Sequence, residues 1–381
     1  MKKIIYAGIA LAASMMFAES CSQSLLEIPK KGVISIENFY QTEEDAESAI
    51  TTVYAAAIKY INIGPGFGAN WCIAPSYFIL KNAPADDIYW GSGNKGDHVF
   101  GIEINEYRPS FGDNSDVVAN NYRGAYQCIY ACNLLTDHYQ FGQSANIDRY
   151  IAEAMTIRAW VYMHLATYWG NPPYVDHVLA GTDRPGNTPH AEVMKHVMED
   201  LETAAKYLPS RNGKGDKDGA VRLTKDAALA FLGKAQVLTG DYAAAKTTLK
   251  QVITSGNYDL VPGDQMMYLF HKRGDGSCEK VFEFNYTDNT DAIKGFGGHM
   301  HVQNNQANFW RDLMNLPDLT IQLMGWGGGG NPSKKFVDAL VANEGDSYRR
   351  KAWIISYEEL LCLKYSSLGD TDETTDEFKL M

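Results

Sequence analysis

The chain has 381 residues, of which 45% are hydrophobic and 21% are charged, values typical of a globular protein. The formal net charge is −12 at pH 7. This acidic balance argues against nucleic acid or anionic lipid as a partner, because phosphate binding depends on clustered lysine and arginine. The six cysteines are scattered along the chain, so the sequence implies no disulfide framework.

The N-terminus has the features of an export signal. Lys2 and Lys3 precede an apolar run from Ile4 to Phe17, and Cys21 follows shortly afterwards. The run is short for a bilayer-spanning helix, which needs ~20 residues. We therefore predict a signal peptide over residues 1–20, with lipidation of Cys21 and anchoring to a membrane. The alternative is an ordinary secretory signal in which Cys21 plays no part.

Amphipathic periodicity predicts a mainly α-helical protein. The sequence Thr42-Glu43-Glu44-Asp45 is typical of a capping box at the start of a helix. Thr188 and Pro189 are expected as the N-cap and the first residue of another helix. The predicted helices cover about 43–60, 117–139, 148–169, 189–208 and 224–255, the last as a pair. The segment 148–169 is apolar on most sides and is expected deep in the core.

The segment 224–255 fits the tetratricopeptide pattern, in which two antiparallel helices interlock through small residues. Placing Gly233 at the repeat's glycine puts Gly240 in the turn between the helices. The other positions in register are Leu229, Leu232, Tyr242, Ala245, Leu249 and Val252. Helix 189–208 fits the second half of an earlier repeat whose first half is helix 148–169. The fold class is therefore predicted as a tetratricopeptide-like helical repeat scaffold.

Two long segments, about 62–116 and 256–331, interrupt the helices and are predicted to be ligand-binding loops, because loops this long are usually functional or contain strands. Residues 281–286 alternate as in a short strand, and a further helix is expected to start at Asn331-Pro332. Flat rings cover the apolar faces of pyranoses, and Asp, Asn and Gln bond the hydroxyl groups. The candidate ligand residues are Trp71, Asp86, Asp87, Tyr89 and Trp90 in the first loop and Asn304, Trp310 and Trp326 in the second. The alternative is that these rings pack the loops onto the helices.

No pattern indicates catalysis, a cofactor or a metal. His299 and His301 alternate, but no cysteine or carboxylate cluster lies beside them. Adjacent Asp86 and Asp87 diverge and cannot flank one glycosidic bond from opposite sides. The sequence contains no P-loop and no GxSxG motif. We therefore expect a binding protein rather than an enzyme.

Several segments together resemble the SusD/RagB family of surface lipoproteins. They are Leu25-Leu26-Glu27-Ile28-Pro29, Asn38-Phe39-Tyr40, Ala152-Glu153-Ala154 with Arg158-Ala159, Tyr168 to Pro173, Val221 to Leu260, Glu279 to Glu283 and Asn331 to Arg350. The resemblance implies a lipid-anchored protein on the outer face of the outer membrane. Such a protein binds a glycan and delivers it to a SusC-like TonB-dependent transporter. The family motifs are scaffold motifs, which implies structural roles for Arg158 and Glu153.

Two alternatives remain open on the sequence. A peptide-binding, RagB-like uptake protein would belong to the same class, whereas a glycoside hydrolase would need two carboxylates facing one cleft. The resemblance also implies one SusD-like domain over residues 21–381. The usual C-terminal portion of the family does not follow Met381, so we expect the chain to be incomplete at that end.

Overall fold

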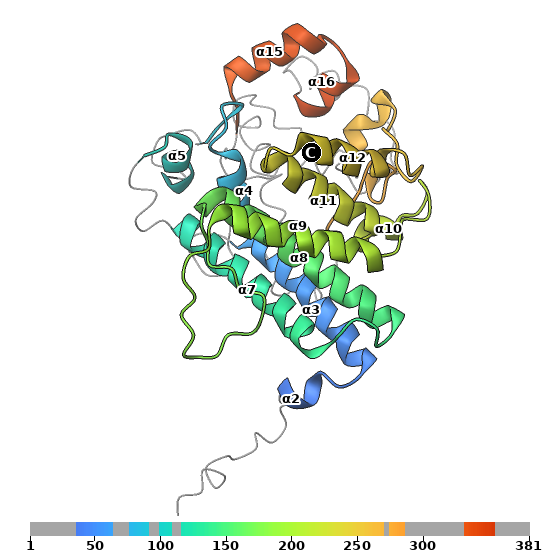
Figure 1. The fold of residues 1–381 in the computed structure, drawn as a ribbon. Helices are drawn as coiled ribbons and strands as arrows, with labels where there is room; N and C mark the ends of the chain where they lie inside the picture. Colours follow the sequence, from blue (N-terminus) through green and yellow to red (C-terminus); the bar gives the residue numbers. More distant parts are fainter. Residues whose placement is uncertain are drawn as a thin grey trace, which may run out of the picture.

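In the computed structural model, the described residues are 36–63, 76–90, 99–108, 116–269, 274–285 and 331–354. Their long helices pack side by side in a stack, with shorter helices at both ends (Figure 1). The elements are α2 (Ile36–Phe39), α3 (Glu43–Asn62), α4 (Ser76–Asn82), β1 (Ile88–Tyr89), α5 (Val99–Asn105), α7 (Asp116–His138), α8 (Ala145–Trp169), α9 (His190–Tyr207), α10 (Asp218–Val221), α11 (Lys225–Leu238), α12 (Tyr242–Ile253), the 3-10 helix η2 (Gly263–Tyr268), β2 (Asn331–Pro332), α15 (Lys334–Glu344) and α16 (Tyr348–Trp353). The mainly α-helical fold class is confirmed.

Helix α3 begins with the predicted capping box. Thr42 Oγ1 accepts a hydrogen bond from Asp45 N at 3.1 Å, and Asp45 Oδ2 accepts one from Thr42 N at 2.9 Å. The two bonds satisfy backbone donors that a helix start leaves unpaired. The apolar face of α3 then packs against α7 and α8.

Helix α8 lies at the centre of the stack, in contact with α3, α7 and α9. Sixteen of its 25 residues are buried, as its nearly continuous apolar character predicts. Ser144 caps its start by accepting a hydrogen bond from Ile147 N at 3.2 Å. At its end, Gly170 has φ 70°, a left-handed conformation that glycine adopts without strain.

The repeat register is confirmed at α11 and α12. A Cβ atom at Gly233 would overlap the side chain of Leu249, so a larger residue here would have to displace Leu249 or move the two helices apart. Gly240 lies in the turn between them with φ 82°. Since α8 packs on α9, α9 on α11, and α11 on α12, the helix pairs stack in sequence.

The start of α9 differs from the prediction. Helix α9 begins at His190, and Pro189 takes the N-cap position without a side-chain hydrogen bond. Thr188 Oγ1 instead accepts a hydrogen bond from Tyr174 N at 3.1 Å, while Asn171 Oδ1 accepts one from His190 N at 2.8 Å. The residues between α8 and α9 fold back onto the helix start and supply its cap from a distance.

The family motif residues have structural roles, as the resemblance implies. The buried guanidinium group of Arg158 donates to both carboxylate oxygens of Asp200 on α9, at 2.9 and 3.0 Å. It also donates to Asn133 Oδ1 on α7 and to the carbonyl oxygen of Asp176. One side chain therefore ties together three helices and the connection between α8 and α9.

The other motif residue, Glu153, is fully buried in α8. Its carboxylate accepts from Arg149 Nε at 2.8 Å and from Arg222 Nη2 at 2.7 Å. A buried carboxylate requires such partners, because removal from water is costly for an unpaired charge. The pair with Arg222 fixes the residues that precede α11 against the central helix.

The two long segments meet at a short antiparallel ladder. Ile88 and Tyr89 of β1 pair with Pro332 and Asn331 of β2, so the first segment joins the end of the second. The first segment also contains α4 and α5, which its loop assignment did not predict.

Two local predictions in the second segment are wrong. Residues 281–285 form no strand, although the backbone is held by a hydrogen bond from Glu283 N to Ala220 O at 2.8 Å. The next helix starts at Lys334 with Ser333 as its N-cap, because Asn331 and Pro332 are used in the ladder.

Candidate functional site

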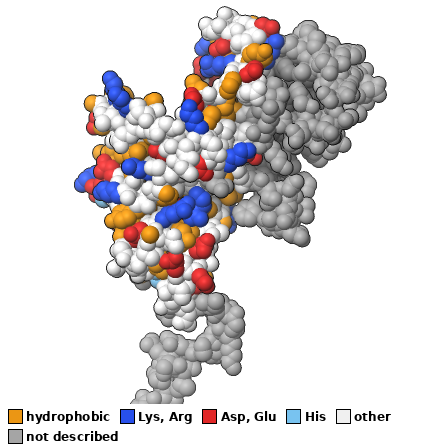
Figure 2. All heavy atoms as spheres, turned by 90° about the vertical axis from the view of Figure 1, so that its right-hand side faces the viewer, with side chains coloured by type: hydrophobic (Ala, Val, Ile, Leu, Met, Phe, Trp, Pro, Cys, Tyr) orange, Lys and Arg blue, Asp and Glu red, His pale blue; other side chains and the backbone are white. Residues whose placement is uncertain are grey.

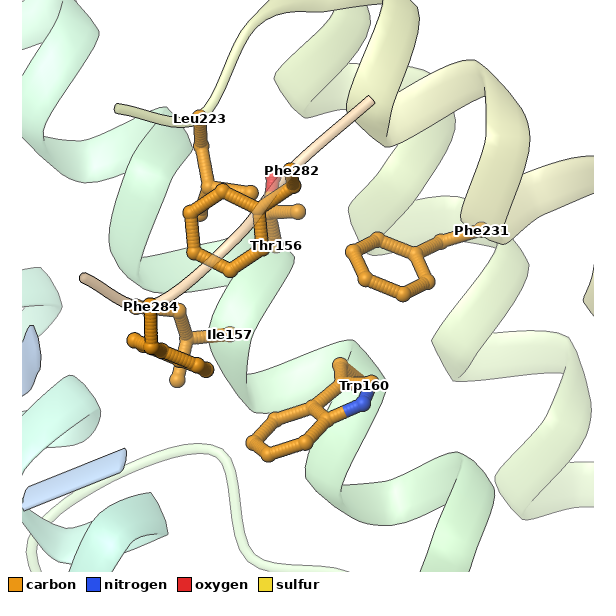
Figure 3. A pocket seen from close by; sticks show the side chains of 7 residues that line it. All are labelled: Thr156, Ile157, Trp160, Leu223, Phe231, Phe282 and Phe284. Atoms are coloured by element: carbon orange, nitrogen blue, oxygen red, sulfur yellow. The ribbon is translucent and has the colours of Figure 1, made fainter. Parts of the chain in front are cut away.

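A small apolar hollow, with a cavity volume of about 10 Å³, lies between α8, α11 and the segment 281–284. Figure 3 shows the side chains converging on it from these three elements and, at Leu223, from the loop before α11. The lining residues are Thr156, Ile157, Trp160, Leu223, Phe231, Phe282 and Phe284. The hollow is therefore walled mainly by aromatic rings.

The rings reach the hollow for simple geometric reasons. Trp160 lies one turn after Thr156 on α8, so both point to the same side of that helix. Phe282 and Phe284 lie two residues apart in an irregular segment, and their ring centroids are 4.9 Å apart. Phe284 in turn lies 6.3 Å from Trp160, centroid to centroid. Trp160, Phe231, Phe282 and Phe284 all keep part of their surface exposed.

A polar and aromatic cluster adjoins the hollow on the other side of Trp160. The ring of His164 lies 4.9 Å from that of Trp160, and His164 Nε2 is 3.3 Å from the Tyr77 hydroxyl. Tyr60 packs edge-on against both Tyr77 and Trp160. The Lys81 ammonium lies 5.4 Å from the centroid of the Tyr77 ring, a cation–π distance.

Burial dominates the electrostatics of this cluster. It lowers the pKa of His164 to about 3, and the positive charges of Lys81 and Lys234 add to the effect. The imidazole is therefore neutral at pH 7. Burial also raises the pKa of Tyr77 and lowers that of Lys81, and Lys234 lowers the pKa of Lys81 further.

The described lining of the hollow is mostly apolar. The seven lining residues include no carboxylate, histidine or cysteine, and Thr156 contributes a hydroxyl group. In the described part of the chain no group of three or more His, Cys, Asp or Glu residues could hold a metal ion. Flat aromatic surfaces instead provide apolar area of fixed shape.

Three of the residues predicted to contact a ligand lie together elsewhere, beside the β1–β2 ladder. Asp86 and Asp87 are exposed, and Tyr89 is 42% exposed. Their loop is fixed by Ser333, whose N and Oγ donate to the carbonyl oxygens of Asp87 and Asp86 at 2.8 Å each. Lys335 Nζ lies 3.3 Å from Asp86 Oδ2. The structure thus brings the two long segments together at this edge.

Trp90 requires a correction. The sequence predicted an exposed ring that stacks on a ligand, but Trp90 is only 1% exposed. Its ring packs against Phe78 at 5.9 Å and lies over Gly101, where a Cβ atom would overlap it. Trp90 anchors a second, small core formed with Ile79, Ile102, Ile104 and Val117.

The other predicted residues lie outside the described residues. They are Trp71, Asn304, Trp310, Trp326 and the lipidation candidate Cys21. Conversely, sequence reasoning did not assign Trp160, Phe231, Phe282 or Phe284 to a site. The alternation of Phe282 and Phe284 is the available signal, although by itself it favours a strand.

Comparison with known proteins gives the same fold. A SusD-like family described as "Starch-binding associating with outer membrane" matches residues 83–236. SusD-like protein P2 of Formosa agariphila is 24% identical over 304 residues, which cover 78% of this chain and 55% of that protein. The chain thus spans about half the length of this curated relative, and 45% of the related protein P25.

Solved structures of SusD-like and glycan-binding proteins also have this fold. A SusD-like carbohydrate-binding protein from Bacteroides fragilis is 25% identical, with a TM-score of 0.53 over 66% of this chain and 48% of its own. Surface glycan-binding protein A from Bacteroides thetaiotaomicron is 21% identical and superposes with a TM-score of 0.65, over 87% of this chain and 67% of its own. The same protein in complex with laminarihexaose gives a TM-score of 0.63 over 82% of this chain and 63% of its own.

The stacked helix pairs define a helical-repeat scaffold. The family model, the curated relatives and the solved structures to which this chain is similar are all SusD-like.

Proposed function

We propose that this protein binds a glycan in the hollow beside Trp160 and takes part in its uptake across an outer membrane. The observation that carries the proposal is the hollow itself, in which the rings of Trp160, Phe231, Phe282 and Phe284 meet without a catalytic group among the lining residues. Such rings fit the apolar C–H faces of pyranoses. The match of residues 83–236 to a family described as starch-binding supports a carbohydrate ligand.

The position in the cell follows from the N-terminus. Lipidation of Cys21 would hold the protein at the outer membrane, because each buried acyl CH₂ contributes ~0.8 kcal/mol. No helix in the described part of the chain is long and apolar enough to cross a membrane. Delivery to a SusC-like TonB-dependent transporter rests on the family resemblance, and the predicted contacts Trp71, Asn304, Trp310 and Trp326 remain part of this proposal.

A glycan array followed by calorimetric titration tests the proposal. Trp160→Ala should weaken binding of the recognised glycan roughly ten-fold, since one ring adds ~0.5–1.5 kcal/mol beyond the area that it covers. Tyr130→Ala is the matched control, because Tyr130 is an aromatic residue on α7 with 47% of its surface exposed and outside the lining. Affinities should be expressed per folded molecule, because Trp160 also packs against the core.

Other outcomes would point to other functions. Binding of peptides but of no glycan would favour an uptake protein of the peptide-binding branch. Release of shorter sugars in a parallel turnover assay would contradict a purely binding role. Equal affinity of the wild type and Trp160→Ala for a glycan would move the site away from the hollow.

A further inference from the structure

The rings of Phe282 and Phe284 lie in a segment that belongs to no regular element. Residues 281–284 are part of neither a helix nor a strand. The segment is held at Glu283, between the two rings, where the backbone N donates to Ala220 O of α10 at 2.8 Å. The direction of both rings therefore depends on the contacts that fix the residues around Glu283.

The buried side chain of Arg211 holds the residues on both sides of this contact. Its Nη1 donates to Lys280 O at 2.7 Å, and its Nη2 donates to Gly276 O at 2.9 Å and to Ser277 O at 3.2 Å. Its Nε donates to Asp216 O at 3.0 Å, two residues before α10. With only 2% of its surface exposed, Arg211 thus joins the start of α10 to the turn segment 276–280, which directly precedes the phenylalanines.

The carboxylate of Glu283 connects this turn segment to the rings. Glu283 Oε1 accepts a hydrogen bond from Gly276 N, and Oε2 lies 3.2 Å from Lys280 Nζ. The side chains of the ion pair are 11% and 18% exposed, so water competes only weakly for these contacts. The residue between the two rings is therefore bound to the same turn segment that Arg211 holds.

The turn segment is also packed closely. Gly276 has φ 66°, a left-handed conformation that glycine adopts without strain. A Cβ atom at this position would overlap Lys217, including its Cα atom at 2.9 Å. Arg211, the turn segment and Glu283 consequently form one closely fitted unit beside the aromatic lining.

The exact position of a few rings matters for this molecule. Figure 2 shows a face on which hydrophobic side chains occur in small groups between charged ones, without a broad apolar patch in its described part. Phe284 lies 6.3 Å from Trp160 and 4.9 Å from Phe282, centroid to centroid. A displaced segment 281–284 would take two of these rings away from the third.

We propose that Arg211 is a positioning residue for the aromatic site: it holds the turn segment 276–280 and, through Glu283, keeps Phe282 and Phe284 beside Trp160. This inference rests on the proposed function and adds a residue outside the lining on which the site depends. Arginine suits the role because its planar group presents several donors in a fixed fork, whereas lysine offers a single ammonium group. Side chains that contact a ligand keep their geometry only when the residues behind them are themselves fixed.

The first experiment observes the rings without any ligand. The full chain is labelled with fluorotryptophan, and the fluorine NMR signal of Trp160 is assigned with the variant Trp160→Phe. Arg211→Gln should shift or broaden this signal, because the ring of Phe284 beside it would move.

Arg350→Gln is the matched control. Arg350 is also buried, and its Nε and Nη1 donate to the carbonyl oxygens of Gly345 and Ile354 at 2.9 and 3.2 Å, around α16. Its loss should lower stability as the loss of Arg211 does, since both variants remove a buried guanidinium group. The Trp160 signal should nevertheless stay at the wild-type position.

The second experiment titrates each variant with the oligosaccharide that the wild type binds most tightly on the glycan array. Arg211→Gln should weaken binding per folded molecule roughly five- to ten-fold, and Arg211→Lys should weaken it less, because one ammonium group replaces only part of the fork. Arg350→Gln should bind as the wild type does.

Variants at Glu283 test the same connection if Arg211→Gln does not fold. Glu283→Ala removes both contacts with the turn segment and should shift the Trp160 signal and weaken binding roughly five- to ten-fold. Glu283→Gln keeps an oxygen that can accept from Gly276 N, so its effects should be smaller.

The results separate this inference from the proposed function. A Trp160 signal and an affinity that stay at wild-type values in Glu283→Ala and in folded Arg211→Gln would refute the positioning role and leave glycan binding intact. Equal losses of affinity in Arg211→Gln and Arg350→Gln would refute it as well, as would a shifted signal with unchanged affinity. If the wild type binds no glycan, the proposed function fails, whereas the NMR comparison still decides whether Arg211 fixes the rings.

Discussion

Asp200 on α9 receives two parallel hydrogen bonds from Arg158 on α8, at 2.9 and 3.0 Å, with the two side chains 10% and 6% exposed. Removing one partner of such a pair leaves the other charge buried without compensation. Asp200→Ala should therefore lower the free energy of unfolding by ~3–5 kcal/mol, measured by urea denaturation.

The neighbouring position provides the control for this variant. Glu199 pairs with Lys195 at 3.6 Å, and these side chains are 52% and 69% exposed. Glu199→Ala should cost no more than ~1 kcal/mol, as is usual for exposed pairs. Similar losses in the two variants would contradict the structural role assigned to Arg158.

The close crossing of α11 and α12 predicts a second effect. Gly233→Leu should lower the free energy of unfolding by ~1–3 kcal/mol, because the new side chain overlaps Leu249. Gly181→Leu is the control, since nothing lies within 4 Å of a Cβ atom at Gly181. If Gly233→Leu melts at the wild-type temperature, the two helices do not cross at that residue.

The burial of Trp90 reverses the effect expected from the sequence. Trp90→Ala should destabilise the second core by ~3–5 kcal/mol, the usual cost of truncating a buried aromatic ring. Glycan affinity per folded molecule should stay unchanged, because Trp90 does not line the hollow. A stable Trp90→Ala protein with weakened binding would instead support the prediction from the sequence that Trp90 contacts the ligand.

The depressed pKa of His164, about 3, makes stability depend on pH. In the unfolded chain the imidazole has an ordinary pKa of ~6.5, so between pH 6.5 and 3 only the unfolded state binds the proton. Stability from this residue is therefore complete above pH ~6.5 and is lost as the pH falls. The loss between pH 7 and 5 should be ~2 kcal/mol.

His164→Gln tests this linkage. Denaturation of the wild type and the variant at several pH values between 7 and 5 gives the difference directly, because contributions from carboxylates are common to both. The variant should show a shallower dependence on pH. Parallel curves for the two proteins would mean that folding does not lower the pKa of His164.

The predicted anchor can be tested in cells. Cys21→Ala should move the protein from the membrane fraction to the soluble fraction, because the acyl chains would be lost. Lys2→Ala serves as a control that keeps the cysteine. Retention of Cys21→Ala at the membrane to the wild-type extent would contradict lipidation at this residue.

Local sequence patterns were sufficient to predict the helices. The capping box at Thr42 and Asp45 and the glycine at position 233 each report on contacts within a few residues or one helix pair, so their meaning does not depend on the rest of the chain. The segment 148–169 is apolar on most sides, and this predicted its central position in the stack. The repeat scaffold was therefore predictable from the sequence.

The sequence by itself determined the helix pairs and the aromatic richness of the long segments. It also predicts the export signal. Only the tertiary structure decided which rings are buried and which border a hollow. Trp90 and Trp160 belong to the same residue type, yet Trp90 is covered by Phe78 and Gly101, whereas Trp160 faces Phe284 and Phe231. Phe231 and Phe284 are distant from Trp160 in sequence, and Phe78 and Gly101 belong to other elements than Trp90. The exposure of a ring therefore depends on how separate elements pack, which no local pattern encodes.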